Sequence, residues 1–156
     1  MRGLVANSQQ SFEEALRCWD KLGDSLLTAE QQGHIGHLRG LALVQLGRND
    51  QAVEEFARAL RGCPRQASLW RELARAQRQL GQWEPAAKSF RKAIQLAPQE
   101  LESAVARVQL AEVYLQLGQT ALAQAEFQRI RSSQAPGNLK FQVEKLAMKA
   151  ALRKRD

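Results

Sequence analysis

The chain has 156 residues, 44% of them hydrophobic and 6% aromatic, with a formal net charge of +7 at pH 7. This length suits about one domain, no apolar run approaches the roughly 18 residues of a membrane span, and the start is not a convincing signal peptide. Cys18 and Cys63 lack the spacing of a CxxC motif or a metal site, so we interpret them as packing residues. They fit a reducing compartment, which slightly favours a cytoplasmic location.

Helices are predicted along the whole chain, because Ala, Leu, Gln and Arg are frequent and the four prolines are few. Thr28 and Gln31 have capping-box spacing, which starts the second helix one turn early. Asn138 is the predicted cap of the last helix. In chain order the predicted helices cover residues around 10–22, then 28–46, 50–62, 67–80, 84–97, 101–117, 120–132 and 139–153.

Two stretches of the sequence repeat each other slot by slot. They read LGRNDQAVEEFARALRGCP at 46–64 and LGQWEPAAKSFRKAIQLAP at 80–98. A third copy at 117–136 keeps Gly118, Ala123 and Phe127, at a slightly longer spacing from the second copy. A weaker copy lies at 11–22. Small alanines allow two antiparallel helices to approach, and each aromatic residue fills the space they leave. A period of about 34 residues indicates a helical repeat array.

This pattern resembles the tetratricopeptide repeat (TPR). The best match is residues 67–100, where the family slots hold Trp70, Leu73, Ala74, Ala86, Phe90, Ala93 and Pro98 and only Gln77 departs. In residues 33–66, Gly36 and Arg39 depart, so the first helix of that repeat is the least certain. The resemblance implies an all-α, right-handed superhelical stack of antiparallel helix pairs. Its predicted parts are a partial repeat and join at 1–32, repeats at 33–66, 67–100 and 104–137, and a capping helix at 138–153.

The resemblance also implies a concave face, lined by the first helix of each pair, that binds a peptide or a partner helix. On the middle repeat Arg71, Arg75 and Arg78 share one helix face, so a basic strip flanked by apolar patches is expected. Such a groove fits an acidic peptide with apolar anchors. The alternative is a solvated face whose arginines pair with Glu72 or Glu112. The predicted groove residues are His37, Leu41, Val44, Arg71, Arg75, Arg78, Val108, Glu112 and Leu115.

Other functions have less support in the sequence. A carboxylate clamp for chaperone C-terminal tails is not present, because its lysine and asparagine slots hold residues such as His37, Leu41 and Arg71. No catalytic constellation occurs, and His34 and His37 lack further metal ligands, so neither enzyme activity, a metal nor a cofactor is expected. Nucleic-acid binding is the alternative, suggested by net charges of +4 in both 67–98 and 138–156. Against it, the aromatic residues occupy packing slots.

The two ends of the chain carry separate predictions. The last helix is expected to be a solvating cap, with Val143, Leu146 and Ala150 inside and its lysines in water. At the start, Met1 falls near position 6 of a repeat, so we interpret the chain as a piece of a longer array. An apolar face around Leu4, Phe12 and Trp19 would then be partly uncovered, which predicts weak self-association.

Overall fold

The computed structural model describes residues 2–22, 27–98 and 101–152 of the chain, and these ranges contain eight helices and no strand. The all-α prediction is confirmed, and the helix ends differ from the predicted ones by at most two residues, apart from the start of the first helix. The helices are α1 (Arg2–Leu22), α2 (Ala29–Gln45), α3 (Asn49–Gly62), α4 (Ala67–Gln79), α5 (Trp83–Leu96), α6 (Leu101–Gln116), α7 (Thr120–Ser132) and α8 (Gly137–Leu152).

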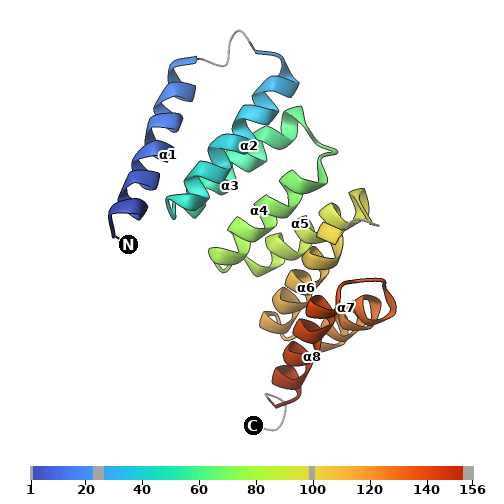
Figure 1. The fold of residues 1–156 in the computed structure, drawn as a ribbon. Coiled ribbons are helices and arrows are strands. Elements are labelled where there is room, and N and C mark those ends of the chain that lie inside the picture. The colour runs from blue at the N-terminus through green and yellow to red at the C-terminus, as the bar shows by residue number, and fades with distance from the viewer. Residues whose placement is uncertain (1, 23–26, 99–100, 153–156) are drawn as a thin grey trace.

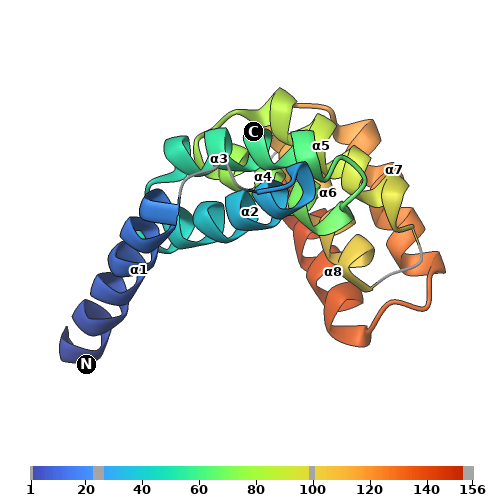
Figure 2. The ribbon, with the colours of Figure 1, turned by 90° about the horizontal axis from the view of Figure 1, so that it is seen from above.

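Consecutive helices form antiparallel pairs that stack one upon the next, as Figure 1 shows from α2–α3 at one end to α6–α7 and α8 at the other. Seen from above in Figure 2, the stack curves into an arch. The second helices of the pairs, α3, α5 and α7, follow its outer edge, whereas α2 and α8 border its open inner side. The first helices therefore line the concave face.

The same turn joins the two helices of every pair. Gly47, Gly81 and Gly118 have φ angles of 74°, 72° and 70°, a left-handed conformation that glycine adopts without steric cost. The backbone N–H of the next residue then donates to a carbonyl of the preceding helix, from Arg48 to Leu43 at 2.9 Å and from Gln82 to Gln77 at 2.9 Å. These bonds satisfy carbonyls that the helix end leaves unpaired.

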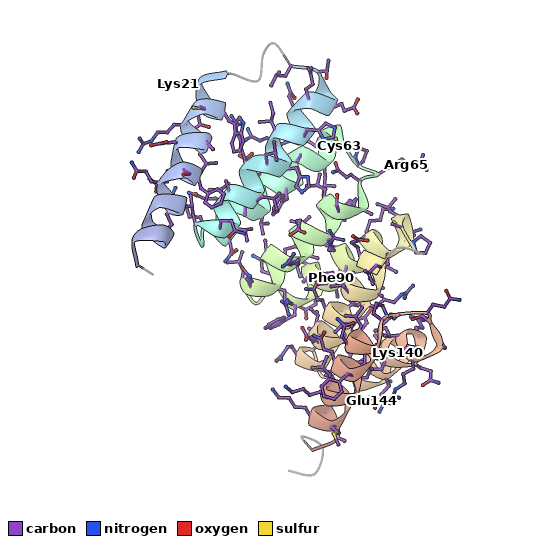
Figure 3. The ribbon with its side chains drawn as sticks, in the orientation of Figure 1. Lys21, Cys63, Arg65, Phe90, Lys140 and Glu144 are labelled. Atoms are coloured by element: carbon purple, nitrogen blue, oxygen red, sulfur yellow. The ribbon has the colours of Figure 1, made fainter. Side chains whose placement is uncertain are left out.

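The repeated phenylalanines form the centre of the core. Phe56 and Phe90 are fully buried and Phe127 is 2% exposed, and Figure 3 labels Phe90 within the stack of α4, α5 and α6. The alanine slots around them, among them Ala52 and Ala86, are also fully buried. The pattern of small and large residues in the sequence therefore corresponds to the packing between helices.

Helix α2 is regular, although the sequence made it the least certain. Its start has the predicted capping box, in which the Thr28 side chain accepts from the Gln31 N–H and the Gln31 side chain accepts from the Thr28 N–H. Gly36 and Gly40 face α3 so closely that a Cβ at Gly36 would lie 3.0 Å from the Ala59 Cβ, and one at Gly40 only 2.3 Å from Phe56 Cε1. These two glycines, of which only Gly36 departs from the family slots, thus permit a close approach of α2 to α3.

Arg39, the other departure in α2, is 7% exposed and ties α1 to the stack. Its Nη2 donates to the backbone carbonyl of Trp19 at 2.7 Å and lies 3.4 Å from the Asp20 carboxylate. Trp19 belongs to the last turn of α1, where carbonyls lack partners within the helix. At this slot the Arg39 side chain therefore caps the C-terminal end of α1 instead of making an apolar packing contact.

Both ends of the chain differ from expectation. Helix α1 runs without interruption from Arg2 to Leu22, whereas the sequence predicted a helix that begins at about residue 10. Helix α8 begins at Gly137, because the Pro136 carbonyl already accepts from the Leu139 and Lys140 N–H groups, and Asn138 lies inside the helix. The predicted self-association is not tested, since the Leu4 side chain lies outside the described residues.

Candidate ligand-binding groove

The predicted basic strip lies on one face of α4. The side chains of Arg71, Arg75 and Arg78 are 21%, 50% and 31% exposed. All three are therefore partly covered, and Arg75 is the most accessible to a ligand.

Each of these arginines has a carboxylate neighbour. Arg71 Nε and Arg75 Nη1 lie 3.7 and 3.3 Å from the Glu72 carboxylate, and Arg78 Nη1 donates to Glu112 of α6 at 2.6 Å. Since Glu72 serves two guanidinium groups, three positive charges face two negative ones and the strip keeps a net charge of about +1. The ion-paired arrangement, one of the two that the sequence left open, is the one present in the structure.

A cleft of about 430 Å³ lies between the ends of α4, α6 and α8. It brings together three of the predicted groove residues, Arg78, Glu112 and Leu115. The other side chains around it come from the ends of α4, α5, α6 and α7 and from α8, namely Gln79, Trp83, Gln116, Thr120, Leu146, Lys149 and Ala150. Its wall is thus partly apolar and partly charged, as in pockets that bind a side chain of a ligand.

Other predicted groove residues lie outside this cleft. Val108 is 1% exposed and packs in the core, because α6 is enclosed by α5, α7 and α8, so its prediction as a ligand contact was wrong. Leu41 and Val44 are half-buried against the core between α2, α3 and α4. They leave only part of their surface to the concave face.

His37 packs against its own helix pair. Its ring lies edge-on to Phe56 with centroids 6.1 Å apart, and its Nδ1 is 3.5 Å from Gln66 Nε2. Burial lowers the pKa of His37, although the nearby Glu72 carboxylate opposes that effect. A neutral, packed imidazole results at pH 7. Within the described residues no three metal-ligating side chains come together.

The sequence reasoning missed part of α8. Lys149, Leu146 and Ala150 border the cleft, and on another side of this helix Phe141 and Met148 are 72% and 71% exposed. The cap was expected to have a polar outer side, and Lys145 and Lys149 are exposed, but these two apolar residues are exposed as well. The seven-residue spacing of Phe141 and Met148, which places both on one helix face, is the signal that could have revealed it.

Among the described helices none has the length and hydropathy to cross a membrane.

Two family models, both described as tetratricopeptide repeat, match residues 37–100 and 105–134. Human Superkiller complex protein 3 is 34% identical over 92 residues, which are 59% of this chain but only 6% of that protein. The chain therefore spans a small fraction of the length of this relative.

Solved structures with the same fold have low sequence identity. The first TPR domain of Spaghetti (RPAP3), bound to the HSP90 peptide SRMEEVD, has a TM-score of 0.67 at 15% identity over 81% of this chain and 96% of its own. The N-terminal domain of stress-induced protein-1 from C. elegans has a TM-score of 0.68 at 14% identity, covering 78% and 98%. MamA AMB-1 has a TM-score of 0.67 at 23% identity, covering 78% and 66%. These likenesses show the fold alone.

Proposed function

Because the chain belongs to the tetratricopeptide repeat family, we propose that it holds a peptide or a helix of a partner protein in its concave groove, with the cleft between α4, α6 and α8 as the centre. Membership of this family makes the chain a protein-interaction scaffold rather than an enzyme. The observation that carries the proposal is the cleft itself, which joins Arg78, Glu112 and Leu115 on the inner side of the arch.

The lining of the cleft suits a ligand with both apolar and acidic groups. Leu115, Trp83 and Leu146 offer an apolar wall for one anchor side chain. The Glu72 carboxylate is shared by Arg71 and Arg75, so one positive charge beside the cleft is left for a carboxylate of the ligand. An affinity of about 1 μM, roughly −8 kcal/mol, is expected for such a peptide.

The peptide-bound structures of the two Spaghetti domains support a peptide as the class of ligand that this fold accepts. Their peptide SRMEEVD is acidic and contains apolar residues. The slots of the carboxylate clamp hold His37, Leu41 and Arg71 here, so a chaperone tail is not proposed. Titration with a free C-terminal EEVD-type peptide should show no micromolar binding.

A display library of short random peptides tests the proposal. Selected peptides, made synthetically and labelled, are titrated by fluorescence anisotropy against the wild type, the R71E/R75E variant and Leu115→Glu. The matched control is K88E/K92E, with the same four-residue spacing and the same charge change on exposed positions of α5. The groove variants should weaken binding at least tenfold and the control less than twofold. Peptides that bind all variants equally would place the site elsewhere.

Nucleic-acid binding is the alternative function. Lys88, Arg91 and Lys92 of α5 are exposed, and none of them forms an ion pair with a described carboxylate, unlike the arginines of α4. A labelled oligonucleotide titrated at two salt concentrations tests this function, because phosphate contacts weaken steeply with salt. Binding that K88E/K92E abolishes and R71E/R75E preserves would favour the alternative.

A further inference from the structure

Helix α8 repeats part of the burial pattern of α6 at a constant offset in the sequence, and it differs at Phe141 and Glu144, which are exposed where α6 buries Val108 and Ala111. Four residues of α6 that are buried have counterparts in α8 that are buried or half-buried against the same core. The pairs are Ala106 with Leu139, Leu110 with Val143, Val113 with Leu146, and Tyr114 with Ala147. Both helices therefore turn the same side toward the stack.

The same offset relates Phe141, Lys145 and Met148 of α8 to Val108, Glu112 and Leu115 of α6. Of these three α6 residues, Glu112 and Leu115 line the cleft, whereas Val108 is buried. Phe141 and Met148 are 72% and 71% exposed, more than the other exposed large hydrophobic residues among the described side chains, which are 39–55% exposed. Two residues seven apart lie about 10.5 Å from each other along a helix. They form a paired apolar face on the helix that closes the cleft.

The charges around this face are positive and mostly uncompensated. Lys145 and Lys149 are exposed, and no carboxylate among the described residues forms an ion pair with either of them. Glu144, labelled on α8 in Figure 3, is held by Arg131 of α7 at 2.7 and 2.8 Å. At the cleft, by contrast, Arg78 is compensated by Glu112. A ligand carboxylate thus finds unpaired cations on α8.

We propose that Phe141, Lys145 and Met148 form an anchor site for an acidic amphipathic helix of a partner protein. The inference deepens the proposed function, on which it rests, by assigning the apolar anchor of the ligand to α8. A partner helix has the same rise per residue as α8, so apolar residues seven apart on it meet both anchors, and an acidic residue between them meets Lys145.

A second copy of the chain fits this face less well. Helix α8 carries Lys140, Lys145 and Lys149 against Glu144 alone, and that carboxylate is already bound by Arg131. Pairing α8 with another α8 would bring together two helices with the same excess of positive charge. Charge complementarity therefore selects an acidic partner.

The test uses a display library of amphipathic helical peptides long enough to span both anchors, with the residues of one face randomised. Selected peptides are titrated against the full chain and against F141Q/M148Q, K145E and R71E/R75E. The matched control is L38Q/L122Q, which removes two exposed leucines, 48% and 47% exposed, from other helices. The selected peptides should be rich in Asp and Glu. F141Q/M148Q and K145E should each weaken binding at least tenfold, and L38Q/L122Q less than twofold.

The outcomes separate this inference from the proposed groove. Peptides that lose binding with R71E/R75E but not with F141Q/M148Q overturn the inference and leave the groove standing. Peptides that depend on both places support one continuous surface, and dependence on α8 alone supports the anchor site without the α4 strip. A library without binders overturns it. A concentration-dependent dimer in sedimentation that F141Q/M148Q abolishes would identify a second copy as the occupant and also overturn it.

Discussion

The helix pairs α2–α3 and α4–α5 have the same spacing of repeated residues but pack differently. Phe56 and Phe90, which occupy the same slot of successive repeats, are both fully buried, yet the residue facing Phe56 is Gly40 and its counterpart in α4 is Ala74. In α2 the aromatic ring occupies the volume that a Cβ would need. The same aromatic slot therefore faces a glycine in one pair and an alanine in the other, and we expect α2 and α3 to lie closer together than α4 and α5.

The largest expected effect is the loss of either phenylalanine. Phe56→Ala and Phe90→Ala should each lower the free energy of unfolding by about 3–5 kcal/mol, because each removes a fully buried ring and leaves a cavity. Urea unfolding followed by circular dichroism measures it. Phe141→Ala, at a 72% exposed position, is the control and should change little. A much smaller cost at Phe56 than at Phe90 would show that α2 and α3 can close the cavity.

Exchange of the facing residues sharpens the comparison. Helix propensity alone predicts that Gly40→Ala stabilises α2 by about 1 kcal/mol, but the new Cβ would lie 2.3 Å from Phe56. We expect destabilisation by about 1–3 kcal/mol instead.

Two further variants, measured by the same urea unfolding, serve as references for Gly40→Ala. Ala74→Gly should cost about 1 kcal/mol, since it introduces glycine into a helix interior. Gly137→Ala, with nothing within 4 Å of the added Cβ, should be neutral or slightly stabilising. A stabilising Gly40→Ala would mean that the two helix pairs have the same separation.

Arg39 and Leu73 occupy the same slot of successive repeats but make different contacts. Leu73 packs in the core, whereas Arg39 donates to the Trp19 carbonyl at 2.7 Å. Arg39→Leu should destabilise the attachment of α1 by roughly 1.5–3 kcal/mol, the range for a hydrogen bond to a charged group. Hydrogen exchange should accelerate in α1 and remain unchanged in α4. Leu73→Met, a swap of similar volume, is the control, and equal exchange in α1 for both variants would contradict this assignment.

The helices and their core slots follow from the sequence, whereas much of the groove does not. The alanine and phenylalanine slots predict the burial of Phe90 correctly, because helix period and residue size are local properties. The burial of Val108 and the close approach at Gly40 depend on where neighbouring helices lie. Arg78 meets its partner Glu112 from the next repeat along the chain. Charge and exposure on the concave face are thus set by the stacking of pairs, which one helix pattern cannot specify.

The smallest expected effect concerns His37, whose counterpart in the next repeat is the permanently charged Arg71. Burial lowers the pKa of His37 below its usual 6.5, with Glu72 opposing and His34 and Arg71 adding to the shift. Below about pH 6.5 the unfolded chain therefore binds a proton before the folded chain does. Stability falls as the pH decreases through that range and levels off once the folded state is also protonated, while above it His37 contributes no pH dependence.

The melting temperature at pH 7.5 and 5.5 measures this effect in the wild type and in His37→Gln. The variant should lose part of the decrease on acidification, because glutamine does not titrate. His34→Gln is the matched control, since the His34 side chain is 57% exposed, and it should retain the wild-type decrease. If both variants follow the wild type, the His37 ring takes up its proton without losing its contact with Phe56, and α2 tolerates a charge at this position as α4 does at Arg71.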